Sequence, residues 1–170
     1  AYSYRLEDQH SVLVYATDAE YKRLDEASLQ PRVEFFGNAD ALVFDAQYTL
    51  KEVWQMRMDF GHSSAMIGVD LARAAGVRKL ILFHHDPTYS DSMLQEIHAR
   101  ALAYQSQHLK ASAAESHCPT CEILLAYEGL TLDLAPPDAV ALQLLEEDEV
   151  AILTPSSVFD ERGVDQLAQR

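Results

Sequence analysis

Short apolar runs bounded by polar residues mark the first part of the chain. Residues 1–7 and 12–17 are aromatic and β-branched runs separated by a polar turn, which predicts a β-hairpin. Residues 17–31 contain six charged residues and end at Pro31, which predicts a charged loop. The continuous apolar run at residues 41–46 is typical of a strand that is covered on both faces.

The clearest helix signal comes next. Residues 47–63 mix aromatic and charged side chains in a connection that is longer than most, and such connections are more often functional than accidental. Ser63 or Ser64 can cap the helix that the apolar spacing predicts over residues 65–76, which end in a glycine. A buried strand follows over residues 77–87. This helix-then-strand order predicts an α/β fold in which the strand pairs in parallel with the earlier one.

The remaining elements are a helix and a second hairpin. Ser90 can cap a helix over residues 91–112. Residues 121–127 and 130–134 are apolar runs split by a Glu-Gly pair, which predicts a tight hairpin. From residue 135 on, the pattern weakens into an acidic run followed by a short strand-like and a short helical stretch.

Composition and charge narrow the class of protein. The 170 residues include 48% hydrophobic and 24% charged residues, as in ordinary folded soluble proteins. Thirteen Lys and Arg against 27 Asp and Glu leave a net charge of −14, which argues against bulk electrostatic binding of nucleic acid. The sequence has neither an apolar run of the ~20 residues that span a bilayer nor an apolar leader. With only two cysteines, we expect a reducing, cytoplasmic setting.

Chemically capable side chains follow three of the predicted strands. Asp18, Asp45 and His84 come at or just after the ends of these strands, and His85 and Asp86 directly follow His84. In α/β sheets the ligand site lies beyond the carboxyl ends of the strands. Imidazoles and carboxylates are ligands of first-row metals. A single aspartate after a strand is usually a turn or cap residue, but three strand ends in register favour a metal site.

His62 adds a fourth element to this set. It lies just before the predicted start of a helix, where backbone N–H groups and the helix dipole favour an anion. Near a metal pair, such a histidine can donate a proton to a leaving group or hold a phosphate oxygen. The alternative is a residue of the helix-capping region with no chemical role.

Other polar residues favour structural roles. Cys118 and Cys121 have the spacing of a redox or zinc pair, but a structural zinc needs a second pair, and His117 is the only adjacent ligand type. His98 and His108 are ten residues apart on one predicted helix, so they share a face but cannot share a metal. We therefore expect these cysteines and histidines to be structural or incidental.

Several motifs together resemble the metallo-β-lactamase fold hydrolases, and within them the ribonuclease Z-like enzymes and related phosphodiesterases. They are TDAE after a strand, DAQYT, LLAYEGLTLDL and the more specific GHSSAMIGVDLARAAGVRKLILFHHDPTYSD. The resemblance covers residues 1–134, and we expect residues 135–170 to be an extension or the start of a further segment. It implies an α/β fold that is one half, the C-terminal half, of a metallo-β-lactamase-type αβ/βα sandwich.

The resemblance also implies roles for individual residues. Asp18 matches the aspartate that bridges two metal ions, and His84 matches the last metal histidine. His62 matches the histidine that assists proton transfer and phosphate binding. His85 and Asp86 would orient the ligands and raise their basicity. The implied reaction is phosphodiester hydrolysis by a hydroxide that two divalent metal ions activate, with zinc expected and manganese or iron as alternatives.

One departure from the family pattern affects the whole site. The metal motif histidine-x-histidine-x-aspartate-histidine is absent from all 170 residues, so this chain alone provides too few ligands for both ions. We therefore expect the missing N-terminal half to come from the same longer protein or from another chain, and we expect a homo-oligomer.

The expected substrate is a small or cyclic phosphodiester rather than long RNA, because the chain is acidic. We expect no membrane partner. The alternative is a non-catalytic regulatory or scaffold domain that keeps the fold without the metals.

Overall fold

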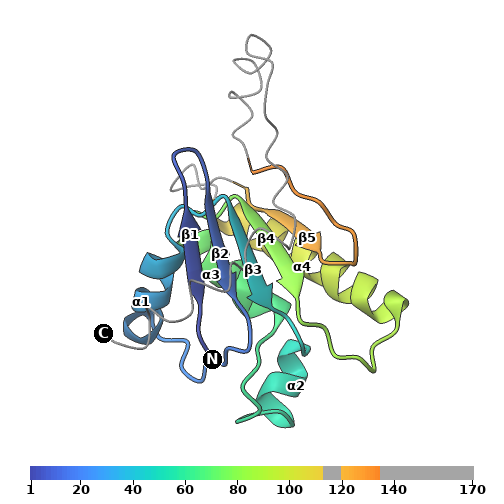
Figure 1. Cartoon of the computed structure of the whole chain (residues 1–170). Coiled ribbons are helices and arrows are strands. Elements are labelled where there is room, and N and C mark those ends of the chain that lie inside the picture. The colour runs from blue at the N-terminus through green and yellow to red at the C-terminus, as the bar shows by residue number, and fades with distance from the viewer. Residues whose placement is uncertain (113–119, 135–170) are drawn as a thin grey trace, which may run out of the picture. The chain divides into compact units, whose positions relative to one another are not determined.

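The computed structural model describes residues 1–112 and 120–134 and contains one five-stranded mixed sheet (Figure 1). The strands lie in the order β1-β2-β3-β4-β5 across the sheet. They are β1 (Tyr4–Glu7), β2 (Val12–Ala16), β3 (Ala41–Asp45), β4 (Lys79–Phe83) and β5 (Glu122–Leu125). The predicted α/β class is confirmed.

Strand pairing agrees with two expectations. β1 and β2 form the antiparallel hairpin predicted from the first apolar runs. β2, β3, β4 and β5 then pair in parallel, with Ala16 opposite Phe44 and Phe44 opposite Leu82. Because these strands run the same way, the carboxyl ends of β2, β3 and β4 meet at one edge of the sheet. That edge carries Asp18 and His84 just beyond the strands.

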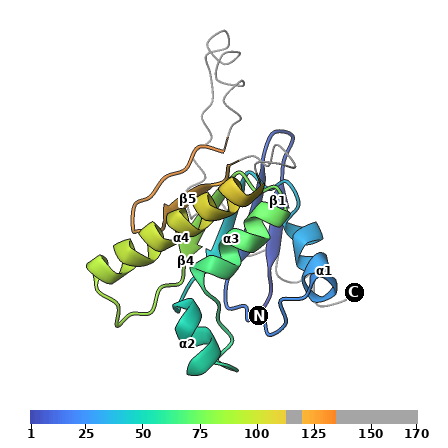
Figure 2. The same ribbon diagram turned by 180° about the vertical axis from the view of Figure 1, so that it is seen from behind.

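Three helices cover one face of the sheet (Figure 2). They are α1 (Glu26–Phe36), α3 (Ala65–Ala74) and α4 (Asp91–Ser112). The core lies between these helices and the sheet, and its largest fully buried apolar side chains are Phe36, Phe44, Leu42, Leu71, Leu80 and Leu82. α3 lies closest to the middle of the sheet because Gly68 faces the ring of Phe44.

Gly68→Ala is expected to lower the free energy of unfolding by about 1–2 kcal/mol. A Cβ at this position would lie 2.7 Å from Cδ1 of the buried Phe44 ring, which is closer than carbon atoms can pack. This overlap outweighs the ~1 kcal/mol that alanine gains over glycine in a helix. Urea unfolding followed by circular dichroism measures the change. The double variant with Phe44→Leu should recover part of the loss, and a single variant as stable as the parent would contradict this packing.

The predicted loop over residues 17–31 is partly wrong, because α1 begins at Glu26 and contains Pro31. The carboxylate of Asp25 accepts the Ser28 backbone N–H and caps the helix. Proline removes one hydrogen bond, but α1 also buries Phe36 in the core, and this tertiary packing outweighs the local signal.

The long connection over residues 47–63 contains a short helix, α2 (Leu50–Gln55), that the apolar pattern did not predict. Thr49 and Glu52 form a capping box, in which each side chain accepts the other residue's backbone N–H. The two ends of the connection meet, because the Tyr48 N–H donates to the Ser63 carbonyl and Tyr48 forms a parallel bridge with Ser64. The two ends of this connection are therefore joined, and we call residues 47–63 the excursion.

The predicted hairpin over residues 121–134 is wrong in its second arm. A turn forms at Glu128 and Gly129, but no strand follows it in residues 130–134, and β5 pairs in parallel with β4 instead. The alternating leucines there are half-buried but belong to no strand, and the Asp133 carbonyl accepts from Lys79 Nζ. Among the helices of residues 1–112, none is long and apolar enough to cross a membrane.

Candidate functional site

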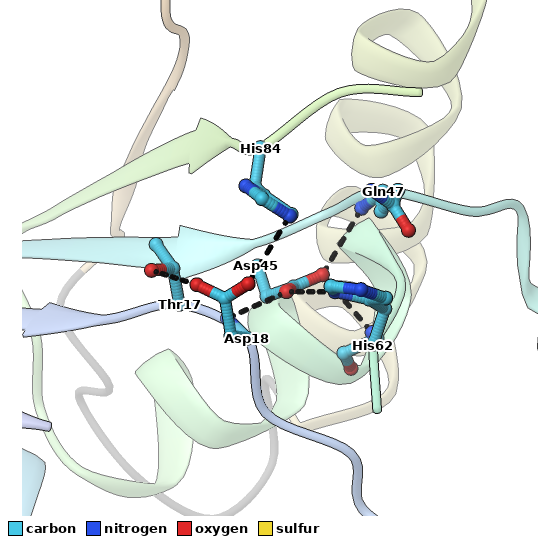
Figure 3. A network of polar contacts seen from close by, with 7 residues as sticks. Thr17, Asp18, Asp45, Gln47, His62 and His84 are labelled. Carbon is cyan, nitrogen blue, oxygen red and sulfur yellow. Dashed lines mark hydrogen bonds and ion pairs between the residues drawn. The ribbon is translucent and has the colours of Figure 1, made fainter. Parts of the chain in front are cut away.

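Two strand ends, those of β2 and β4, and the residue that precedes α3 by three positions bring Asp18, His84 and His62 together at the carboxyl edge of the sheet (Figure 3). Asp45, at the third strand end, is not among the grouped ligands. One ligand atom from each of the three residues lies within 4.8 Å of the other two. His84 Nε2 is 3.3 Å from Asp18 Oδ1, and the rings of His62 and His84 stack with their centroids 4.9 Å apart. The expected convergence of these three residues is present, and we call them the Asp-His-His cluster.

Asp45, the last residue of β3, holds residues of this cluster in position through hydrogen bonds. Its side chain is fully buried, and its carboxylate accepts the backbone N–H of Asp18 at 2.8 Å and of Ser63 at 3.0 Å. The Gln47 N–H donates to it at 3.2 Å, and His62 Nδ1 lies 2.9 Å from its second oxygen. A buried carboxylate is tolerated because these donors satisfy it. Asp45 therefore fixes both the backbone at Asp18 and the ring of His62.

The contact with Asp45 determines which nitrogen of His62 is free for chemistry. The carboxylate can only accept, so Nδ1 carries the hydrogen in this pair. Nε2 is then available either to bind a metal or, when the ring is protonated, to donate a proton. The edge of the Tyr48 ring contacts the imidazole at 5.9 Å between centroids and limits its rotation.

Two residues of the cluster have an unusual backbone conformation. Asp18 has φ 53° and His84 has φ 59°, in the left-handed region that residues with a Cβ seldom adopt. Such conformations cost of order 1–3 kcal/mol and persist where the surroundings impose them. Here the bend turns the chain sharply as it leaves β2 and β4, and it aims both side chains at the same point above the strand ends.

The donor set fits a first-row divalent metal. The cluster offers one carboxylate and two imidazoles, which suit zinc, manganese or iron, and three protein ligands are the number that catalytic zinc sites use. Thr17 Oγ1 donates to Asp18 Oδ2 at 2.9 Å and orients the carboxylate. The structure groups His62 with Asp18 and His84, so its predicted role in proton transfer rather than metal binding stays a prediction.

His85 and Asp86 lie beside the cluster but do not contact it by hydrogen bonds within residues 1–112 and 120–134. The Asp86 carboxylate accepts the N–H and hydroxyl of Thr88, which lower the pKa of Asp86. Burial lowers the pKa of His85 and favours its neutral ring. The orienting role predicted for these two residues stays a prediction, whereas Asp45, to which the motifs assigned no role, is seen to orient.

The other polar residues that the sequence singled out lie away from the cluster. His98 Nε2 is 2.8 Å from the Ile123 carbonyl and ties α4 to β5. His108 packs against the Tyr104 ring with their centroids 4.4 Å apart. Cys121 is buried at the start of β5, while Cys118 and His117 lie outside the described residues.

Comparison with known proteins yields matches over part of the chain. Ribonuclease Z from Prochlorococcus marinus is 33% identical over 78 residues, which are 46% of this chain and 22% of the relative. Ribonuclease Z from Archaeoglobus fulgidus is 38% identical over 66 residues, 39% of this chain and 21% of the relative. The match to ribonuclease Z from Thermoplasma acidophilum is 35% over 68 residues, 40% and 22% of the two chains. The chain thus matches about a fifth of the length of these relatives.

Among solved structures, the metallo-β-lactamase fold protein YhfI from Bacillus subtilis has a TM-score of 0.49 at 20% identity. The superposition covers 74% of this chain and 41% of YhfI. No protein-family model matches the sequence. The chain is therefore distantly and partially similar to ribonuclease Z, which confirms the resemblance predicted from its motifs.

Proposed function

We propose that this chain forms part of a metal-dependent hydrolase of phosphodiester bonds. The observation that carries the proposal is the Asp-His-His cluster at the carboxyl edge of a parallel sheet, with His62 held by the buried Asp45. The partial similarity to ribonuclease Z supports the same reaction class. The activity of the whole protein, its substrate and its partners are all parts of this proposal.

Asp18 and His84 would hold the metal, and Asp18 can serve two ions because its carboxylate has two oxygens. Oδ1 faces His84 at 3.3 Å, and Oδ2 accepts the Thr17 hydroxyl. Divalent metal ions lower the pKa of water to about 7 and offset negative charge on a phosphate oxygen. We propose zinc, with manganese or iron as alternatives, and two ions in a site completed by ligands from outside this chain.

His62 would move the proton. With Nδ1–H directed to Asp45, a protonated His62 keeps Nε2–H free to donate, and one of its ring nitrogens lies within 4.8 Å of the ligand atoms of Asp18 and His84. The leaving alkoxide oxygen takes this proton as its bond to phosphorus breaks, and the neutral ring regains a proton from solvent. The Asp45 carboxylate stabilises the positive charge that the ring carries before it gives up the proton.

A small or cyclic phosphodiester is the proposed substrate, because a net charge of −14 repels long polyanions. We further propose that the protein is cytoplasmic and associates with a second copy of itself. We also propose that its site is completed by the half that carries the histidine-x-histidine-x-aspartate-histidine motif, which this chain does not contain. A non-catalytic domain that keeps the fold without metals is the competing hypothesis, and metal binding separates the two.

The first test is metal binding by the chain itself. Titration with Mn²⁺, followed by water-proton relaxation, should reveal a site that Asp18→Asn and His84→Ala each weaken at least about tenfold, since each removes a direct ligand. His98→Ala is the control because His98 contacts β5 instead. A site that both variants leave unchanged would refute the assignment, and the absence of any site would favour the scaffold hypothesis.

The second test concerns the reaction. The protein in its natural full length should hydrolyse bis-p-nitrophenyl phosphate and a cyclic nucleotide faster than a tRNA precursor, and chelation should stop both reactions. The 170-residue chain alone should show no appreciable turnover, because it lacks the histidine-rich motif. Robust metal-dependent turnover by the chain alone would mean that it holds further ligands, and faster cleavage of the tRNA precursor would overturn the proposed substrate class.

A further inference from the structure

Arg57 has an unusual setting in the excursion that carries α2. Its guanidinium lies over the ring of Tyr48 and over the ring of Phe60, with 5.3 Å from Cζ to each centroid. The side chain is half-buried between exposed neighbours, and its Nε is buried without a hydrogen-bond partner. Within residues 1–112 and 120–134, no carboxylate lies within ion-pair distance of it. The two rings hold the guanidinium in place without neutralising its charge.

The lack of an ion pair to Arg57 among the described residues is notable in a chain in which acidic residues outnumber basic ones, 27 to 13. Arg78 is paired with Asp40, and Arg100 is paired with Glu96. With acidic residues in excess, a half-buried arginine would be expected to find a carboxylate. Arg57 is instead in contact with two aromatic rings, which attract a cation without using its N–H donors, and its Nε has no partner. The Glu52 carboxylate interacts with this charge electrostatically but forms no ion pair with it, so the N–H donors of Arg57 are available to an external anion.

Arg57 also lies beside the Asp-His-His cluster. The Tyr48 ring contacts both the Arg57 guanidinium and the His62 imidazole. The Tyr89 hydroxyl donates to Glu52 of α2 and ties the excursion to the start of α4. Arg57 is thus held close to His62, the proposed proton donor, since both contact the Tyr48 ring.

The chemistry of this site favours a phosphate. A guanidinium presents N–H donors in a planar fork that matches two phosphate oxygens, and it stays charged at every working pH. The two rings in contact with it restrict its rotamers, so less entropy is lost when an anion binds. Phe60 is 55% exposed and adds an apolar surface on which a base or another flat group can stack.

We propose that Arg57 is a phosphate-binding residue that positions the substrate beside the Asp-His-His cluster. The identity of this phosphate as part of a phosphodiester substrate rests on the proposed function, whereas the binding of an anion by Arg57 does not. The competing explanation is that Arg57 serves only to hold Tyr48 and Phe60 together.

Anion binding can be tested without metal or turnover. The chain has a single tryptophan, Trp54, three residues before Arg57, and its fluorescence can follow a titration with inorganic phosphate in excess EDTA at constant ionic strength. The ¹H–¹⁵N signal of Arg57 Nε provides a local second readout. Arg57→Gln should raise the phosphate midpoint about tenfold or more, because a hydrogen-bonded charge is lost. Arg57→Lys should give an intermediate value, because it keeps a point charge without the fork.

Lys51→Gln is the matched control, since Lys51 is an exposed cation of α2 in the same excursion and its charge does not lie over either ring. It should leave the midpoint unchanged. Equal midpoints for the parent and Arg57→Gln, or an equal loss in Lys51→Gln, would overturn the proposal. If Arg57→Gln fails to fold, Arg57→Lys and the Nε signal of the parent protein decide, and an Nε signal that phosphate does not move would also overturn it.

Kinetics of the natural full-length protein separate positioning from support. Arg57→Gln should raise KM for a phosphodiester about tenfold while kcat and metal content stay near the parent values. A residue that only supports the rings would lower the thermal midpoint and leave KM unchanged, which would refute the positioning role. Failure of metal binding by Asp18 and His84 would refute the proposed function but would leave the phosphate titration intact, so the two failures are distinguishable.

Discussion

Asp45→Asn is expected to lower the free energy of unfolding by about 3 kcal/mol or more and to abolish metal binding by the Asp-His-His cluster. The carboxylate is fully buried and accepts from three backbone N–H groups and from His62. An amide in its place keeps the shape but directs N–H donors at other donors. Asp18 and His62 then both lose the contact that orients them. Urea unfolding and a Mn²⁺ titration on the same preparation measure the two effects.

Asp40→Asn provides the matched control. Asp40 accepts the Val12 N–H and pairs with Arg78, so its loss also costs stability, but it lies at the amino end of β3, away from the cluster. We expect a stability loss with unchanged metal affinity. If Asp45→Asn is as stable as the parent protein and binds metal equally well, the assigned role of Asp45 is wrong.

His62→Ala in the natural full-length protein should reduce kcat by roughly 10²–10⁴ while metal content stays near that of the parent protein. The reason is that the proposed contact of His62 Nε2 is with the leaving oxygen. His84→Ala should reduce both metal content and kcat, because it removes a direct ligand. Metal analysis of each purified variant, together with turnover of bis-p-nitrophenyl phosphate, separates the two roles.

The position of His62 inside the Asp-His-His cluster makes this comparison decisive. One donor atom of His62 lies within 4.8 Å of those of Asp18 and His84, which makes His62 a candidate ligand as well. If His62→Ala loses metal as fully as His84→Ala, His62 is a ligand and the division of roles is wrong. If neither substitution changes turnover, the cluster is not catalytic and the scaffold hypothesis is favoured.

The sheet could be predicted from the sequence because its strands are short, apolar and regularly spaced. β3 and β4 have continuous apolar runs, as expected of strands in a parallel sheet, and Gly76 ends α3 with φ 68°, which the absence of a Cβ permits. α1 was missed because Pro31 argues against a helix locally, while the burial of Phe36 favours one in the folded chain. The second arm of the late hairpin was wrong because alternation reports one-sided burial and not strand pairing.

The part of the site that lies at strand ends could be predicted from the sequence. Asp18 and His84 come directly after strands of one parallel sheet, and His62 directly precedes a helix, so their convergence follows from topology. The role of Asp45 was missed although a signal existed, since a carboxylate at the end of an otherwise apolar run must be satisfied by nearby donors. Arg57 had no such signal, because only the folded excursion brings the rings of Tyr48 and Phe60 against it.

Because its two ends are joined, the excursion forms a structurally separate unit of the molecule. The bridge between Tyr48 and Ser64 sets where the excursion leaves and rejoins the scaffold, and Asp45 anchors His62 independently of α2. Insertions or deletions within residues 50–60 cost little loop-closure entropy once both ends are fixed. Residues 50–60 could therefore be exchanged as a cassette, which would alter the groups that meet the substrate and leave the strand-end chemistry in place.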